Sequence, residues 1–146
     1  MADMAPSKRA AETSHAVAGN LLLLRNGAGM SLRQLSGELA EHGVTISAQS
    51  LSAIERGDTA VTVDLLTALA AVFSVSPIRL LMPNTDDGFD PAVALTGTES
   101  TYPISLYEWL AGVAPLGISV NTSDIDPRVV AAFRDRSQPP WLREKG

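Results

Sequence analysis

The sequence contains no cysteine, which excludes disulfide bonds and thiolate metal sites. Lysine is almost as scarce: Lys8 and Lys145 are the only two, and both lie near a terminus. A serine–lysine hydrolytic pair inside a folded domain is therefore not expected. The two histidines, His15 and His42, fall at the ends of predicted helices and show no metal-ligand spacing. Together with the lack of a glycine-rich phosphate loop, these absences predict no enzyme, no catalytic residue, no metal site and no cofactor.

Long apolar runs are also missing. The longest, Leu65–Val75, is interrupted by Thr67 and Ser74 and is far shorter than the ~20 apolar residues that span a bilayer. The first nine residues lack the apolar segment of a signal peptide. We therefore expect a soluble cytoplasmic protein that does not bind membranes.

Excess positive charge is the third absence, because the net charge of the 146 residues is −5. Residues 1–83 carry six basic and seven acidic groups, whereas residues 84–146 carry five basic and nine acidic groups. The acidity is thus concentrated in the second half. Any binding to phosphate through the first half should be modest in affinity and strongly dependent on salt.

The most informative segment is Ser47–Gly57, which has the signals of a short helix. Ser47 can cap its first turn, and Gly57 can take the left-handed conformation that ends a helix. Leu51 and Ile54 have the spacing of an inward face. The opposite stripe contains Gln49, Ser52, Ala53 and Arg56. A short helix with small, polar and basic groups outside has a shape that can enter a DNA major groove.

A family resemblance rests on three motifs: Ser31–Leu35, then Ile54-Glu55-Arg56-Gly57, then Val63–Ala70. Together they resemble the lambda-repressor-like (Xre-type) helix-turn-helix family over about residues 15–82. The resemblance implies an all-α fold. It also implies a five-helix domain whose third helix reads DNA. Residues 84–146 show no such resemblance.

The resemblance assigns groove-facing positions to Ala48, Gln49, Ser50 and Ala53, and the outward stripe adds Ser52. Gln49 is the strongest candidate for base reading, since an amide can both donate to and accept from the major-groove edge of adenine. The alternative is that Gln49 is an ordinary solvated helix residue. The two alanines can contact a thymine methyl group but cannot form hydrogen bonds.

Candidate phosphate contacts are Ser31, Arg33 and Arg56, with a neutral hydrogen bond also expected from Ser50. Each arginine considered alone is equally well explained as a solvated surface residue. Asp58 follows the third helix, where the family commonly has basic residues, and should repel phosphate.

Arg25 and Glu55 match a conserved pair implied by the resemblance, in which an arginine at the end of the first helix binds the glutamate before the terminal glycine. We expect a structural ion pair that holds the third helix against the first, rather than a contact to DNA.

The expected organisation has four parts. Residues 1–13 form a mobile arm, in which Lys8 and Arg9 follow a DNA groove or belong to an ordinary terminus. Residues 14–83 form the DNA-binding domain, 84–104 a linker, and 105–146 a short, mostly helical extension. The apolar spacing predicts helices over 105–114 and from Asp126-Pro127 onward.

The extension is expected to mediate dimerisation or to dock a protein partner. Leu22 and Leu23 lie off the inward stripe of the first helix and invite cover by the extension or a second subunit, unless the core is wide there. The candidate surface contains Leu22, Leu23, Leu106, Trp109, Leu110, Val113, Val129 and Phe133.

These observations favour a sequence-specific regulator of transcription, repressor-like and dimeric, that binds double-stranded DNA. The acidic balance, Ala48, Ala53 and Asp58 favour an alternative: a helix-turn-helix module for protein interaction, such as an antitoxin or adaptor with little DNA specificity. A third hypothesis is a small-molecule sensor with its pocket between extension and bundle.

Overall fold

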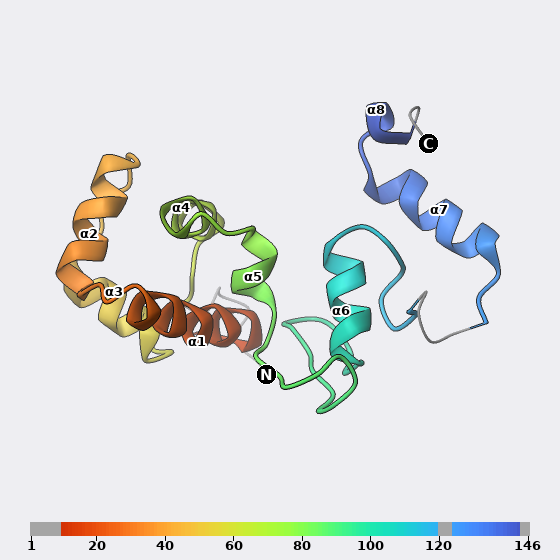
Figure 1. Ribbon diagram of the computed structural model, residues 1–146, viewed down its shortest axis with the longest axis horizontal. Helices are drawn as coiled ribbons and strands as arrows, with labels where there is room; N and C mark the ends of the chain where they lie inside the picture. The colour runs from red at the N-terminus through yellow and green to blue at the C-terminus, as the bar shows by residue number, and fades with distance from the viewer. Residues whose placement is uncertain (1–9, 120–123, 144–146) are drawn as a thin grey trace, which may run out of the picture. The chain divides into compact units, whose positions relative to one another are not determined.

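The computed structural model describes residues 10–119 and 124–143, and these residues form eight α-helices and one isolated β-bridge. They divide into two compact units, one ending at Asn84 and the other beginning at Thr85 (Figure 1). The all-α prediction is confirmed. The first unit contains α1 (Glu12–Gly27), α2 (Leu32–Glu41), α3 (Ala48–Glu55), α4 (Val63–Phe73) and α5 (Pro77–Leu81). The second contains α6 (Pro103–Leu110), α7 (Pro127–Ser137) and α8 (Pro140–Arg143).

Local capping explains where most of these helices begin. The side chains of Ser47, Thr62, Ser76 and Asp126 each accept a hydrogen bond from a backbone N–H in the first turn of the following helix. The cap at Ser47 is expected from the sequence. Proline follows two of these caps at the first helical position, where its missing N–H costs nothing. Helix starts are therefore encoded by neighbouring residues.

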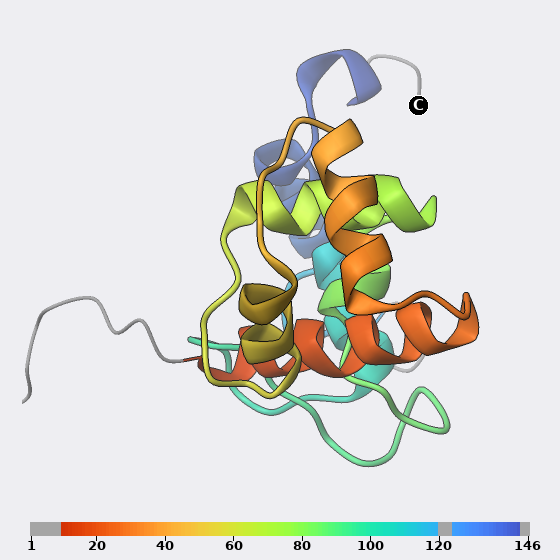
Figure 2. The same ribbon diagram turned by 90° about the vertical axis from the view of Figure 1, so that its left-hand side faces the viewer.

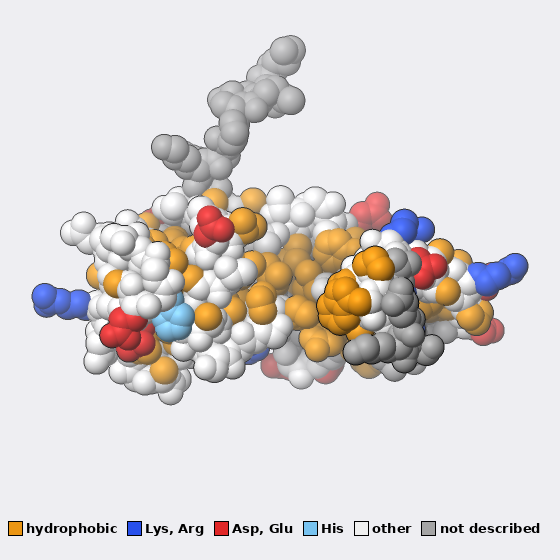
Figure 3. Space-filling view, turned by 90° about the horizontal axis from the view of Figure 1, so that it is seen from above, with side chains coloured by type: hydrophobic (Ala, Val, Ile, Leu, Met, Phe, Trp, Pro, Cys, Tyr) orange, Lys and Arg blue, Asp and Glu red, His pale blue; other side chains and the backbone are white. Residues whose placement is uncertain are grey.

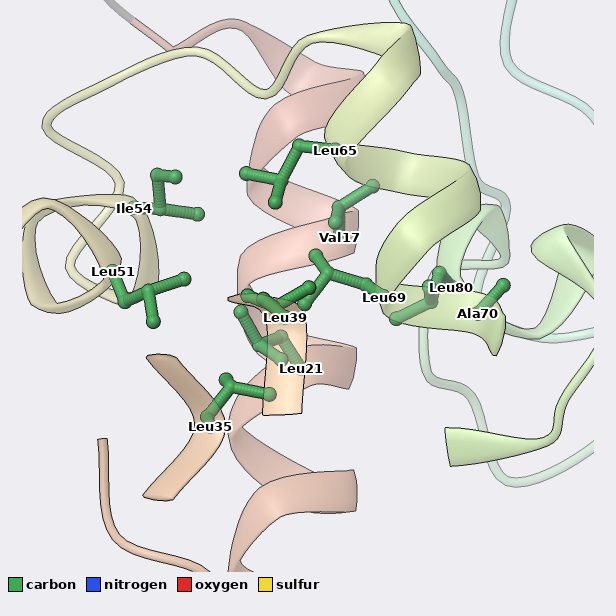
Figure 4. Close-up of a cluster of buried hydrophobic side chains, with 10 residues drawn as sticks. All are labelled: Val17, Leu21, Leu35, Leu39, Leu51, Ile54, Leu65, Leu69, Ala70 and Leu80. Carbon is green, nitrogen blue, oxygen red and sulfur yellow. The ribbon is translucent and has the colours of Figure 1, made fainter. Parts of the chain in front are cut away.

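The core of the first unit is built from all five of its helices. Leucines from α1, α2, α3, α4 and α5 point toward one another in Figure 4, and several have no exposed surface. The fully buried members are Leu21, Leu35, Leu39, Leu51, Leu69 and Leu80. Truncating one such leucine to alanine typically costs about 2.7 to 5 kcal/mol, so this cluster fixes the position of α3 firmly.

Asn20 is a buried polar residue that the sequence analysis missed. Its side chain is 1% exposed on α1, and its Nδ2 donates to the carbonyl oxygens of Leu80 at 2.8 Å and Met82 at 2.6 Å. Its Oδ1 accepts a hydrogen bond from Arg79 at 3.0 Å. One amide thus binds α1 to the end of α5 across some 60 residues of sequence.

We expect Asn20→Ala to destabilise the first unit by about 2 kcal/mol, since it leaves two carbonyls of a largely buried segment without donors. Urea denaturation followed by circular dichroism measures this change. Asn26→Ala is the matched control, because Asn26 is an exposed amide on the same helix. Equal midpoints for the two variants would show that the Asn20 bonds contribute nothing.

Residues 85–102 are folded as part of the second unit, whereas the sequence analysis expected a linker over 84–104. Val93 and Thr101 pair as an antiparallel bridge through two hydrogen bonds of 2.9 Å. Val93 and Leu95 are buried, and the Thr98 side chain closes the turn after them through hydrogen bonds to the backbone of Leu95. Two buried apolar side chains within a glycine- and threonine-rich segment were too weak a pattern to predict this.

The helices of the second unit also differ in extent from the expectation. α6 ends at Leu110 rather than near 114, because Gly112 adopts a φ of +72° and Val113 donates back to the carbonyl of Glu108. α7 begins after Asp126 as predicted, and α8 was not anticipated. Arg134 of α7 and Gln138, which follows that helix, donate from their side chains to the carbonyls of Val113 and Gly112 after α6.

The predicted N-terminal arm lies mostly outside the described residues, including Lys8 and Arg9. α1 starts at Glu12, within the range 1–13 expected for the arm. None of the helices that the structure describes is long and apolar enough to cross a membrane.

Candidate nucleic-acid interface

α2 and α3 form two successive helices joined by a short turn, at the end of the first unit that faces the viewer in Figure 2. α2 buries Leu35 and Leu39 and α3 buries Leu51 and Ile54 in the common core. The remaining faces of both helices point outward. In DNA-binding proteins with this arrangement, the second helix enters the major groove.

The residues predicted to read bases lie along the outward part of α3. Gln49 and Ser50 are exposed, whereas Ala48, Ser52 and Ala53 are half-buried. Ser50 also belongs to the cap of α3: its N–H donates to the Ser47 hydroxyl, which in turn donates to the Ser50 hydroxyl at 3.0 Å. Gln49 thus combines exposure with an amide capable of bidentate base recognition.

The predicted phosphate contacts of α2 lie at its N-terminus. Ser31 forms a capping box with Gln34, in which its hydroxyl accepts from the Gln34 N–H and its own N–H donates to Oε1 of Gln34. Arg33 is exposed and has no salt-bridge partner among the described residues. The free N–H groups and positive dipole of a helix N-terminus make this a favourable position for a phosphate.

Arg56, the other predicted phosphate contact, is held by two neighbours. Its Nε donates to Asp58 at 3.0 Å and its Nη1 to the hydroxyl of Ser52 at 2.6 Å. Both members of the ion pair are about 60% exposed, so the pair contributes little to stability. Asp58, expected from the sequence to repel phosphate, also neutralises Arg56 across the turn at Gly57, a contact that the sequence does not reveal.

The Arg25–Glu55 pair lies beneath the outward face of α3. The Arg25 guanidinium donates two hydrogen bonds to the Glu55 carboxylate, from Nε at 2.6 Å and from Nη2 at 2.8 Å. Their side chains are 15% and 8% exposed, and Nη1 of Arg25 also binds the carbonyl of Met30. The hydrogen bond to Glu55 raises the pKa of Arg25 above its ordinary value, so the guanidinium stays protonated.

The charge on the described surface is mixed. Figure 3 shows few basic side chains on the face it presents, together with carboxylates and many apolar side chains. Of the arginines in the first unit, Arg25 and Arg56 are paired with carboxylates and Arg79 is bonded to Asn20. Among the described basic groups of the first unit, Arg33 is therefore the one best placed for a phosphate. Among the residues described, no cluster of three or more histidines and carboxylates could hold a metal ion.

The predicted partner surface is divided by the structure. Leu106 is fully buried, so its assignment to a contact surface is wrong: the inward face of α6 contains it. Leu22, Leu23 and Val129 are 39%, 48% and 43% exposed, and they stay candidates for a contact. Trp109, Leu110, Val113 and Phe133 are half-buried.

α7 and α8 expose more apolar surface than the sequence analysis predicted. Trp141 and Leu142 of α8 are 63% and 45% exposed and were not named as contact residues. None of the residues of α7 is buried. The signal that could have indicated Trp141 is an aromatic residue directly after two prolines, where it cannot belong to α7.

Comparison with known protein families places this arrangement in a class. The family model described as Helix-turn-helix matches residues 21–80, from the middle of α1 to α5. The match confirms the resemblance to the helix-turn-helix family identified from the sequence, over residues 21–80. No curated protein matches the chain.

One solved structure is similar to part of the chain. It is the crystal structure of the hypothetical transcription factor NHTF from Neisseria, with 24% sequence identity and a TM-score of 0.44. The similarity covers 53% of this chain and 86% of the other.

Proposed function

We propose that this protein is a DNA-binding regulator of transcription that reads its sites with α3 and acts as a dimer. The observation that carries the proposal is the position of α3: one face is locked into the leucine core and onto the Arg25–Glu55 pair, while Gln49 and Ser50 are exposed opposite. A rigid helix presenting an amide outward is suited to reading an adenine in the major groove. Ala48, Ser52 and Ala53 complete this surface.

Phosphate contacts position α3 in this proposal. Arg33 and Ser31 approach one strand from the N-terminus of α2, and Arg56 contacts phosphate after leaving Asp58. Because few basic groups take part, binding is modest at physiological salt and needs two subunits. Binding over a promoter then represses transcription by occlusion, in the cytoplasm.

Asp58→Asn should strengthen DNA binding about threefold and steepen its salt dependence by about one charge, because it frees Arg56 and removes a carboxylate near phosphate. Stability should change little, since the ion pair is exposed. Fluorescence anisotropy of a labelled duplex across a salt series measures both quantities. Glu41→Gln is the matched control: it removes the same charge from exposed α2 surface without freeing an arginine. Equal gains in the two variants would assign the effect to net charge alone.

Dimerisation is proposed through the apolar side of α7, where Val129 is exposed and Phe133 half-buried, with Trp141 and Leu142 of α8 nearby in sequence. Val129→Asp should convert a dimer to the 15.4 kDa monomer in sedimentation equilibrium. Ala131→Asp, on another side of the same helix, is the control and should stay dimeric. A wild-type protein that sediments as a monomer would refute this part of the proposal.

A protein-interaction module with little DNA specificity is the second candidate function. The pairing of Arg56 with Asp58 favours it, because it lowers the free positive charge beside α3. In that case Asp58→Asn would leave duplex binding weak and independent of sequence.

A further inference from the structure

A groove of about 480 Å³ lies beside α3, between the α2–α3 turn, the loop after α3 and the first turn of α4. Its lining is mainly apolar and includes Ile54 and Leu65, which are only 4% and 6% exposed, and the small side chain of Ala53. Sites for small organic molecules typically measure about 300 to 1,000 Å³ and combine an apolar lining with a few polar groups. The size and lining of this groove therefore match a small-molecule site.

Charge restricts what this groove can hold. Among the described residues that line it, Asp64 is the one charged residue, and none is a lysine, arginine or histidine. The Asp64 carboxylate has no salt-bridge partner within the described part of the chain. An anionic ligand, including a phosphate, would meet an unpaired negative charge, whereas a cation would find a partner.

We propose that this groove is a binding site for a cationic small molecule with an apolar body. The apolar body covers Ile54 and Leu65, and an ammonium or amidinium group pairs with Asp64 at the edge. This site is distinct from the pocket between extension and bundle considered above, because all its lining residues belong to the first unit.

Occupancy of the groove also has a consequence for DNA, which rests on the proposed function. Gln49, Ser50 and Ala53 contribute to the groove lining and also form the surface of α3 proposed to read bases. A bound molecule therefore covers the groups that DNA needs, and the two ligands exclude each other. The protein would dissociate from its DNA site when a cationic apolar compound accumulates.

A pair of dyes with the same fluorophore and opposite charge tests the site without DNA. Monodansylcadaverine is an apolar naphthalene with an ammonium tail, and dansylglycine carries a carboxylate instead. We expect the full-length protein to bind the cationic dye about fivefold more tightly, as expected for one exposed charge pair. Equal affinity for the two dyes, or no measurable binding of the cationic dye, would overturn the proposal.

Two variants assign the binding to this groove. Asp64→Asn should reduce the preference for the cationic dye to about one, and Ala53→Met, which fills the groove, should weaken both dyes. Glu38→Gln is the matched control, an exposed carboxylate on α2 outside the groove lining, and should retain the wild-type preference. An unchanged preference in Asp64→Asn would place the dye elsewhere and refute the assignment.

Competition is measured separately with a labelled duplex that the protein has selected from a random pool. Monodansylcadaverine should release the duplex from wild type but not from Asp64→Asn at the same dye concentration. Because both proteins are tested with the same duplex and dye, the variant controls for any effect of dye that binds to the DNA. Dye binding without competition would overturn the exclusion and leave the ligand site standing. Failure to select any duplex would count against the proposed function, while the dye preference would still decide the ligand site.

Discussion

Glu55→Ala should lower the free energy of unfolding by about 2 to 3 kcal/mol, near the lower end of the range for a broken buried ion pair. The substitution leaves the Arg25 guanidinium 15% exposed and without the carboxylate that receives two of its hydrogen bonds. Leaving the Arg25 charge unpaired in that position lowers the free energy of unfolding by more than the intact pair contributes to it. Chemical denaturation of the full-length protein measures the loss.

The control for this result is Glu38→Ala, which removes an exposed carboxylate from α2 and should leave stability nearly unchanged. Arg25→Ala with Glu55→Ala completes a double-mutant cycle. Because the two residues share hydrogen bonds, the double variant should lose clearly less than the sum of the single losses. A Glu55→Ala protein that unfolds like wild type would show that the pair does not hold α3 in place.

Gln49→Ala should lose about 1 to 3 kcal/mol of discrimination at one base pair of each half-site, the usual value of a bidentate contact. Gln49 is exposed on α3, so its loss should not affect folding. The slope of affinity against salt should also stay the same, because the amide contacts a base and not a phosphate. Anisotropy titrations with the selected duplex and single-substituted duplexes measure the change at each position.

Asn26→Ala removes an exposed amide from the far end of α1 and provides the control for this comparison. It should bind every duplex as wild type does. If Gln49→Ala instead weakened all duplexes equally, Gln49 would be a general contact, and sequence recognition would have to come from elsewhere on α3.

Local signals made much of the first unit predictable from sequence. A hydroxyl at Ser47 or Thr62 caps the helix immediately after it, so the start of the helix depends on residues within one turn. Gly57 ends the α3 region with a φ of +77°, a conformation that glycine adopts without strain. The spacing of Leu51 and Ile54 likewise indicated which face of α3 is buried.

The features that escaped prediction depend on tertiary contacts. Asn20 is recognisable as a buried bridge only once α5 is placed beside α1, because its partners lie some 60 residues away. The pairing of Arg56 with Asp58 requires the turn at Gly57 to fold back. Leu106 has the same spacing as its half-buried neighbours on α6, so periodicity alone could not show that it is fully buried.

The groove beside α3 is another property that no sequence pattern revealed. It is assembled from three segments that meet only in the folded unit. Asp64, the one carboxylate among its described lining residues, has in the sequence the pattern of an ordinary first-turn residue of α4. In this protein, caps and apolar spacing within a short segment predict where a helix forms, whereas the shape of a site depends on how distant segments pack together.

Selection of bound sequences from a random duplex pool by the purified full-length protein tests the central claim most directly, with affinity for the enriched sequence then followed across a salt series. We predict an enriched, two-fold symmetric site whose half-sites lie about one helical turn of DNA apart, with affinity that falls steeply as salt rises. An unenriched pool, with only weak binding that disappears at physiological salt, would contradict a sequence-specific regulator and favour the protein-interaction module.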